Sequence, residues 1–375
     1  MTRGTFPTNR TELVALGVLT AVSVALGALF AVFFNRLPVE GTTLAIDWKG
    51  LWADIRSGVH YGTLRNPPWS IFFLYPLTWL PMQAAWGVAM YLTLMVLIVS
   101  VPPTHPRWRY WLGVLLLTTS IPSLRHMADG NLEGVMVAGL LLVLYGYHRA
   151  SAPALAAGLL LGTAKPQQVF LLLPVLGVYM LLTLSRRVLL QTAAMCLTVM
   201  IPALVWRGEE WWAIGINAIP DRNSLMDMSL MAALNRMGLG APTVKIIVIG
   251  AVAGLAFWTA WQVRPVLSRE LVGMLVAASL LAAPYSAGNS VLVVLALGVI
   301  PVFQRRVVPG LVLIALYNAS IVLNNVEYRH LAAYYQTGLT LLSLLVLAAD
   351  VLHQRRQPEP SAGSTAVKRQ QPMRA

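Results

Sequence analysis

The chain contains a single cysteine, Cys196, among 375 residues, and only 11% of its residues are charged. One thiol cannot form an internal disulfide, and zinc clusters built from thiolates need several. The sequence also lacks a Walker-type phosphate loop, a glycine-rich dinucleotide fingerprint and a His-Glu-x-x-His motif. These absences argue against nucleotide-driven transport, zinc proteolysis and a cytosolic site for nucleotide sugars.

Apolar residues dominate the composition, and 57% of the chain is hydrophobic. Repeated apolar runs of about 20 residues are typical of membrane-spanning helices, so we expect an all-α polytopic membrane protein. The net charge is +13, but the basic residues stand in short segments between the apolar runs. This placement indicates topology signals, and we expect no nucleic-acid partner.

The apolar runs predict about twelve crossings. The first covers 11–34, which is too long for the apolar core of a signal peptide and is expected to remain in the protein. The stretch 69–80 is short and bounded by prolines, so it predicts a half-span or an interfacial helix. Further spans are expected at 84–101, 109–122, 131–148, 151–165, 167–184, 188–206, 243–263, 269–285, 289–303, 307–323 and 331–352. Several of these are short enough to be tilted, broken or buried by neighbours.

Arginines and acids alternate between successive loops, and arginine-rich loops stay in the cytoplasm. The arginine-rich loops hold Arg107, Arg109, Arg149, Arg186, Arg187, Arg264, Arg269, Arg305 and Arg306. We therefore predict that both chain ends are cytoplasmic and that the segments 35–69 and 207–242 are external. Residues 1–352 are expected to form one transmembrane domain, and 353–375 a disordered cytoplasmic tail.

The first external segment concentrates the polarity of the chain. From Glu40 to Trp69 it alternates acids, bases and large amphipathic rings. The charged or basic members are Glu40, Asp47, Lys49, Asp54, Arg56, His60 and Arg65, and the aromatic members include Trp48, Trp52, Tyr61 and Trp69. Such a segment suits a membrane interface at which a charged ligand is held, so we expect it to carry the chemistry.

Other polar residues interrupt the apolar runs. Lys165, in G-T-A-K-P-Q-Q, either snorkels from a turn to the outer interface or faces an anionic ligand in an external cavity. Arg125 and His126 precede the span at 131–148, and a helix start beside basic residues can hold phosphate. Ordinary helix capping is the alternative explanation for this cluster and for Asn289.

Three motifs, taken in order, resemble one enzyme family. They are D-W-K-G-L-W-A-D-I-R-S-G-V-H-Y-G followed by N-P-P-W, then D-G-N-L-E-G-V, then A-G-L-L-L-G-T-A-K-P-Q. Together they resemble the GT-C superfamily of membrane glycosyltransferases, in particular glycosyltransferase family 87, the polyprenyl-phosphate-mannose-dependent mannosyltransferases. The similarity covers 10–185, and A-A-P-Y-S-A-G-N-S resembles a later family element.

The resemblance implies a GT-C-like fold with interfacial helices in the first external loop. It implies that a hexose, mannose in this family, passes from a polyprenyl-phosphate donor to a lipid or glycan acceptor with inversion. The reaction would take place at the outer face of the plasma membrane. The lipid-linked sugar is a substrate, and the resemblance implies neither a cofactor nor a metal.

The same resemblance assigns roles to individual residues. Asp47 matches the first-loop aspartate that acts as base for the acceptor hydroxyl. The cations expected against the donor phosphate are Lys165, Arg125, Lys49, Arg65 and His60. The side chains expected against the sugar or the acceptor are Trp48, Tyr61, Trp69, Asn131 and Asn289.

Two questions stay open at this point. Asp47 can also serve as a helix cap. Asp54 would lie about 10 Å from Asp47 on the same helix face. For Asp54 we expect pairing with a cation or exposure to solvent. The alternative function is a membrane carrier or flippase for a lipid-linked or anionic solute, and a third possibility is a scaffold. A carrier predicts mid-membrane ionisable residues in several spans and similar halves, whereas here the ionisable residues cluster outside.

Overall fold

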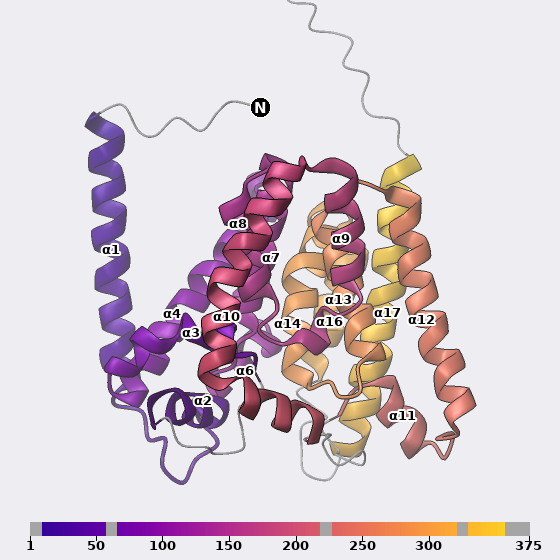
Figure 1. The fold of residues 1–375 in the computed structure, drawn as a ribbon, viewed down its shortest axis with the longest axis horizontal. Helices are drawn as coiled ribbons and strands as arrows, with labels where there is room; N and C mark the ends of the chain where they lie inside the picture. The colour runs from indigo at the N-terminus through magenta and orange to yellow at the C-terminus, as the bar shows by residue number, and fades with distance from the viewer. Residues whose placement is uncertain (1–9, 58–65, 218–226, 321–328, 357–375) are drawn as a thin grey trace, which may run out of the picture.

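A computed structural model describes residues 10–57, 66–217, 227–320 and 329–356 of the chain (Figure 1). Within these residues the protein is all-helical, as predicted, and β-type pairing is limited to an isolated antiparallel bridge between Asp227 and Ala287. The boundary predicted for the tail at 353 is too early, because α17 (Arg329–Arg356) continues to Arg356. The rest of that predicted tail lies outside the described residues.

Five of the described helices are long and apolar enough to cross a membrane. They are α1 (Arg10–Phe34), α4 (Met82–Ser100), α10 (Arg186–Asn217), α12 (Pro242–Val263) and α17. A sixth candidate span is the pair α6 (Ile121–Asp129) and α7 (Glu133–Arg149), which is bent by 115° at its break. The described residues therefore form a helical protein with membrane-capable helices, but their lengths do not establish the twelve crossings expected from the sequence.

The remaining apolar runs form shorter helices. They are α5 (Arg107–Thr118), α8 (Ala152–Gly162), α9 (Leu172–Thr183), α13 (Arg269–Ala282), α14 (Val291–Val294), the π-helical turn Leu295–Val299, α15 (Ile300–Arg305) and α16 (Val307–Ala319). α8 has 11 residues and is about 16 Å long, roughly half the thickness of a bilayer core. Its helix cannot continue through Lys165, because Pro166 disfavours helical backbone at the preceding residue.

Short helices also form at the segments predicted to be external. The first segment contains α2 (Ile46–Ser57). The proline-bounded run 69–80 forms two short helices, α3 (Pro68–Phe72) and the 3₁₀ helix η1 (Tyr75–Trp79), rather than one continuous helix. The second segment begins at a kink in α10, where Arg207 has non-helical φ and ψ angles, and the helix after the kink ends at Asn217. α11 (Leu230–Arg236) lies further along the same segment.

α13 lies in the middle of one half of the bundle (Figure 1). Every side chain from Glu270 to Ala282 is buried, as expected for a helix that is apolar around its whole circumference. α12, α14, α15 and α17 all contact it. Short helices therefore form this part of the core, and longer helices enclose them.

Glycines allow α7 and α8 to pack with their backbones in contact. A Cβ atom at Gly139 would lie 2.2 Å from the Gly162 nitrogen, and one at Gly158 would lie 2.6 Å from the Val143 nitrogen. Small residues let helices associate closely in membranes, where lipid offers no hydrophobic drive for association. The contact fixes the start of α7 relative to the turn that follows α8, and polar residues converge there.

α1 lies at the edge of the bundle and packs against α4 (Figure 1). A Cβ atom at Gly87 would lie 2.6 Å from the Phe30 carbonyl oxygen, and the Ser23 and Tyr91 hydroxyls are 2.7 Å apart. Much of the other surface of α1 is apolar and exposed, as a lipid-facing helix requires. α1 begins and α17 ends at one end of the molecule, whereas α2 and α11 lie at the other end.

Two buried indoles hold α2 against the bundle. Trp48 Nε1 donates a hydrogen bond to the Met82 carbonyl oxygen at 3.0 Å, and Trp86 Nε1 donates to the Met127 carbonyl oxygen at 2.9 Å. Gly130 has a φ of +72°, and a Cβ atom there would lie only 2.5 Å from the Trp48 Cβ atom. These contacts place the first turn of α2 beside the break between α6 and α7.

Gly139→Ala is expected to lower the thermal stability of the full-length protein in detergent. The added methyl group would meet the Gly162 backbone, which cannot rotate away, so we expect a loss of about 1–3 kcal/mol in unfolding free energy. Gly177→Ala in α9 is the matched control, because its added Cβ would meet no described atom outside its own helix within 4 Å. Equal melting temperatures for the two variants would contradict backbone contact between α7 and α8.

Candidate active site

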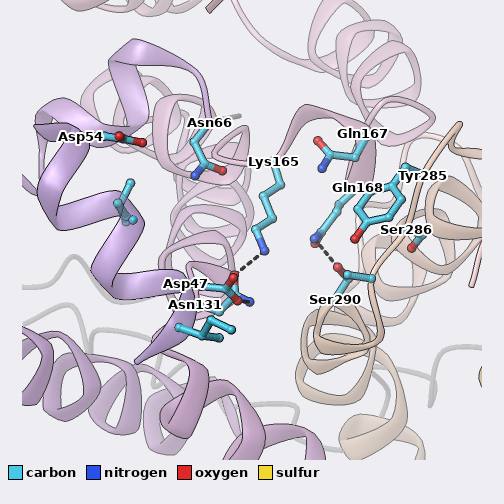
Figure 2. Close-up of a pocket in the computed structure, with 14 residues that line it drawn as sticks. Asp47, Asp54, Asn66, Asn131, Lys165, Gln167, Gln168, Tyr285, Ser286 and Ser290 are labelled. Carbon is cyan, nitrogen blue, oxygen red and sulfur yellow. Dashed lines mark hydrogen bonds between the residues drawn. The ribbon is translucent and has the colours of Figure 1, made fainter. Parts of the chain in front are cut away.

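A cavity of about 360 Å³ opens beside α2 (Figure 2). Segments far apart in the sequence line it: α2, the junction of α6 with α7, the turn after α8 and the segment 285–290. The lining residues are Ile46, Asp47, Gly50, Leu51, Asp54, Asn66, Asn131, Lys165, Gln167, Gln168, Tyr285, Ser286, Ala287 and Ser290. The carboxylates, the ammonium group, the amides and the hydroxyls suit the cavity to a polar ligand.

Asp47 lies in the first turn of α2, which confirms the prediction that it stands at a helix start. The preceding Ala45 has a φ of 53°, and its N–H group donates to the Ala128 carbonyl oxygen at 2.7 Å. The Asp47 Oδ2 atom accepts a 2.6 Å hydrogen bond from Asn131 Nδ2. Asp47 is nevertheless exposed and lines the cavity, so its carboxylate is both oriented and accessible.

Although Asp47 as a whole is exposed, the protein around its carboxyl group removes part of that group's hydration, and this desolvation raises the pKa of Asp47 above its ordinary value of 3.8. The Lys165 ammonium opposes this shift, and the carboxylates of Asp129 and Glu133 add to it. A carboxylate with a raised pKa is a stronger base once it is ionised. Asp47 can therefore accept a proton from a neutral group that enters the cavity.

Lys165 points toward Asn131 and Asp47 in Figure 2. Its Nζ atom lies 2.5 Å from Asn131 Oδ1 and 2.5 Å from Glu133 Oε1. The side chain is 14% exposed, which leaves the ammonium group at the cavity surface. Of the two roles left open for Lys165 by the sequence, the structure therefore places it at a cavity rather than at the lipid interface.

Glu133 forms the support beneath Lys165. The Glu133 and His126 side chains are both 0% exposed, and His126 Nδ1 lies 3.1 Å from Glu133 Oε2. Gln168 Nε2 lies 3.4 Å from Glu133 Oε1 and donates to Ser290 Oγ at 2.6 Å. A buried carboxylate requires such partners, and its place in the first turn of α7 adds the favourable field of the helix dipole.

Asp227 organises the side of the cavity opposite α2. Its Oδ1 atom accepts hydrogen bonds from the Ser229 N–H at 2.9 Å and the Ser286 N–H at 3.0 Å. The Met228 N–H donates to the Ser286 carbonyl oxygen at 2.8 Å. Asp227 is itself buried. These bonds shape the backbone of the segment from Tyr285 to Ser290, which presents hydroxyl groups to the cavity.

Two of the aromatic residues predicted to contact the sugar, Trp48 and Trp69, lie away from the cavity. Trp48 is 1% exposed and belongs to the core beneath α2. Trp69 is 8% exposed, donates to Thr163 Oγ1 at 3.1 Å and packs edge-on against Trp211. Neither is among the described lining residues, because each indole N–H group finds its partner inside the helical packing. The structure thus replaces their predicted ligand contact with a packing role.

Two of the predicted phosphate-binding cations also lie elsewhere. The Lys49 ammonium donates to the Val39 carbonyl oxygen. Arg125 lies within α6 rather than in a loop, and its Nε atom is 3.5 Å from Asp129 Oδ2. Lys165 is the cation that the cavity lining contains among the described residues. The expectation that Arg125 and Lys165 share one cavity is therefore wrong for Arg125.

Further predicted residues fall outside what the structure describes. These are His60, Tyr61, Arg65 and the side chain of Asn289. The backbone of Asn289 forms part of the 3₁₀ turn Gly288–Ser290, next to a lining residue. Asn131, by contrast, lines the cavity and bonds both Asp47 and Lys165.

Asp54, which the sequence places on the same helix face as Asp47, is 3% exposed and lines the cavity with it. The solvent-facing alternative for Asp54 is therefore wrong. Glu133 was not predicted as a site residue, although an acid at the start of an apolar run was a signal for it. No local pattern pointed to Gln168 or Asp227 as parts of the site.

No protein-family model, curated protein or solved structure matches the chain. The geometry of the cavity therefore carries the functional argument. Within the described ranges, no group of three or more His, Cys, Asp or Glu side chains could hold a metal ion. The arrangement places a basic carboxylate beside an ammonium group that can receive negative charge.

Lys165→Met is expected to raise the pKa of Asp47 further. The change removes a positive charge that lowers this pKa, while the effect of burial remains. Carbodiimide modifies protonated carboxyls, so labelling of Asp47 can be followed across pH by mass spectrometry. A raised pKa keeps the proton bound to higher pH, so the labelling midpoint should move upward.

Lys245→Met in α12 is the matched control for this measurement, because Lys245 does not line the cavity. In Lys245→Met, the pH midpoint of carbodiimide labelling at Asp47 should equal that of the unmodified protein. A midpoint for Lys165→Met that stays in place or moves downward would contradict the electrostatic coupling between Lys165 and Asp47.

Proposed function

We propose that this protein is a membrane glycosyltransferase that moves a hexose from a polyprenyl-phosphate donor to a lipid or glycan acceptor at the cavity beside α2. The observation that carries the proposal is the presence of Asp47 and Lys165 at one cavity, joined through Asn131. One group can take a proton, and the other can stabilise a leaving phosphate. This combination suits an inverting transfer from a phosphate-linked sugar.

In the proposed reaction, the acceptor hydroxyl donates a hydrogen bond to the Asp47 carboxylate. As its oxygen attacks the anomeric carbon, the hydroxyl proton passes to Asp47, and the bond from the anomeric carbon to the phosphate oxygen breaks. Attack from the face opposite the phosphate inverts the anomeric centre. The raised pKa of Asp47 brings its basicity closer to the working pH, where general bases are most effective.

The leaving phosphate gains negative charge as the sugar departs, and Lys165 is the group proposed to receive it. Its ammonium is already oriented by Glu133 and Asn131, so little reorganisation is needed during reaction. The second hydrogen bond of Asn131 orients the base as well. Asn131 is therefore proposed to set the distance between the base and the phosphate site.

The other lining groups are proposed to hold the sugar and the acceptor. Asp54, Gln167, Tyr285 and Ser286 line the cavity and offer hydrogen-bond donors and acceptors of the kind that carbohydrate hydroxyls require. Mannose as the sugar is proposed from the three motifs that resemble family 87. A GT-C-like fold belongs to the same proposal.

The cavity is proposed to open on the outer face of the plasma membrane. It lies beside α2, at the end of the molecule opposite to the start of α1 and the end of α17. The arginine-rich loops favour a cytoplasmic position for those two helix ends. A polyprenyl-phosphate donor in the outer leaflet could then present its sugar without crossing the bilayer.

A carrier for a lipid-linked or anionic solute is the second candidate. The observation in its favour is the buried pair of Glu133 and His126 at the break of a bent candidate span, because ionisable residues at such breaks often mark transport paths. A carrier would move its lipid-linked solute without consuming it. Formation of a glycosylated product by the purified protein therefore distinguishes the two functions.

Asp47→Asn is expected to abolish sugar transfer while the protein stays folded. The amide cannot take the hydroxyl proton, so we expect a fall of about 10²–10⁴-fold in the rate of transfer from a radiolabelled polyprenyl-phosphate sugar. Asp54→Asn should reduce transfer less, and Glu40→Gln, at an exposed carboxylate outside the cavity lining, should leave it unchanged. Near-normal transfer by Asp47→Asn would refute Asp47 as the base.

The topology is tested by labelling single cysteines in a Cys196→Ala background. Thr43→Cys lies in an exposed turn before α2 and should react with a membrane-impermeant maleimide in intact cells. Ser185→Cys, in the exposed turn between α9 and α10, is the matched site for the opposite face and should react only after permeabilisation. The reverse pattern would overturn the outward orientation of the cavity.

A further inference from the structure

A second cavity of about 460 Å³ lies where the end of α4, the last turns of α7 and the start of α13 meet. Its walls are mostly apolar and include Val99, Leu141, Leu142 and Leu144. Val99 is 71% exposed, so one wall continues directly onto the surface of the helical bundle. This cavity takes no part in the function proposed above.

The second cavity is far from the candidate active site. α7 carries Glu133 at its first residue and Arg149 at its last, and its 17 residues span about 24 Å. α4 likewise begins at Met82, which bonds Trp48 of α2, and ends beside Val99. Two helices therefore connect the cavities, at a separation close to the ~30 Å thickness of a bilayer core. The second cavity lies near the level of the opposite membrane interface.

Three basic side chains line one side of this cavity. Arg149 lies over the Tyr145 ring, with 5.9 Å between the guanidinium carbon and the ring centroid. His148 Nε2 donates to the Leu267 carbonyl oxygen at 2.9 Å, and Arg269 donates to a backbone carbonyl at the end of α4. None of the described lining residues is acidic. The basic groups are thus held at the cavity wall, without a carboxylate among the lining residues to neutralise them.

An anionic phospholipid matches this combination of surfaces. Guanidinium groups bind phosphate through charge-assisted hydrogen bonds, and an acyl chain matches the leucine and valine wall. A free phosphate ion would use the basic side and leave the apolar wall exposed. A neutral lipid would cover the apolar wall and leave the basic groups without an anion. Charge complementarity together with the apolar wall therefore favours the phospholipid.

We propose that this cavity binds one anionic phospholipid, with its phosphate against Arg149 and Arg269 and an acyl chain along Leu141 and Leu142. The bound lipid would cover the junction of α4, α7 and α13 from the membrane side. This proposal does not depend on sugar transfer. If the protein transfers no sugar, the lipid proposal is unaffected, and if it binds no lipid here, the proposed sugar transfer is unaffected.

The test is to count phosphatidylglycerol molecules retained by the full-length protein in native mass spectrometry after mild detergent exchange. The unmodified protein should retain one phosphatidylglycerol in preference to phosphatidylcholine. Arg149→Gln should weaken this binding about fivefold, since an arginine near an anionic lipid contributes on the order of 1 kcal/mol. Leu142→Trp should also weaken it, because the added ring fills the cavity without changing the charge.

Arg187→Gln is the matched control, because this exposed arginine at the start of α10 does not line the cavity. It should bind phosphatidylglycerol as the unmodified protein does, and the melting temperature of each variant verifies folding. Equal loss in Arg149→Gln and Arg187→Gln would overturn the proposal in favour of general attraction to anionic lipid. Displacement of phosphatidylglycerol by millimolar inorganic phosphate would show that the cavity binds a soluble anion instead. Retention of phosphatidylcholine equal to that of phosphatidylglycerol would show that the basic groups do not select the lipid.

Discussion

The contact between the Lys165 ammonium and the buried Glu133 carboxylate is the interaction on which the candidate active site depends. A carboxylate that is 0% exposed loses its hydration, and it is stable as an anion only beside a cation and hydrogen-bond donors. His126 supplies one such group from α6, and Lys165 and Gln168 supply the others from the turn after α8. Because this one buried charge needs partners, the turn after α8 packs against the break between α6 and α7. The turn and the break both line the cavity beside α2.

Helices that stop short of a full crossing explain why polar groups gather at this place. The break between α6 and α7 bends by 115°, α8 ends before Lys165, and an irregular segment precedes α14. Backbone groups left unpaired at membrane depth require polar partners or a water-filled space. Asn131 accepts from the Leu132 N–H, and Asp227 accepts from the Ser229 and Ser286 N–H groups. Asn131 and Ser286 both line the cavity. The same breaks that lower the count of full-length spans therefore create the site.

The opposite end of the protein uses charge differently. Arg305 donates to Glu270 and to Asp350, and Arg306 Nε lies 3.7 Å from Asp350 Oδ1, which ties α13, α15 and α17 together. There the buried acids are already paired with arginines in a closed structural network. Around α2, by contrast, Asp47 remains exposed to a cavity and has a raised pKa. This difference is the physical reason for proposing a reaction at the α2 end.

The sequence by itself determined several of the helices and the position of Asp47 and Lys165 along the chain relative to them. The run 243–263 became Pro242–Val263, Asp47 stands in the first turn of α2, and Lys165 stands at a helix break, because apolar runs, proline and capping act locally. Tertiary structure decided which side chains meet. Asn131 reaches Asp47 across 84 positions of sequence, Glu133 is buried against Lys165, and Trp48 packs into the core because its indole finds the Met82 carbonyl oxygen. Those pairings depend on helix packing and on satisfying buried charges, which no local pattern encodes.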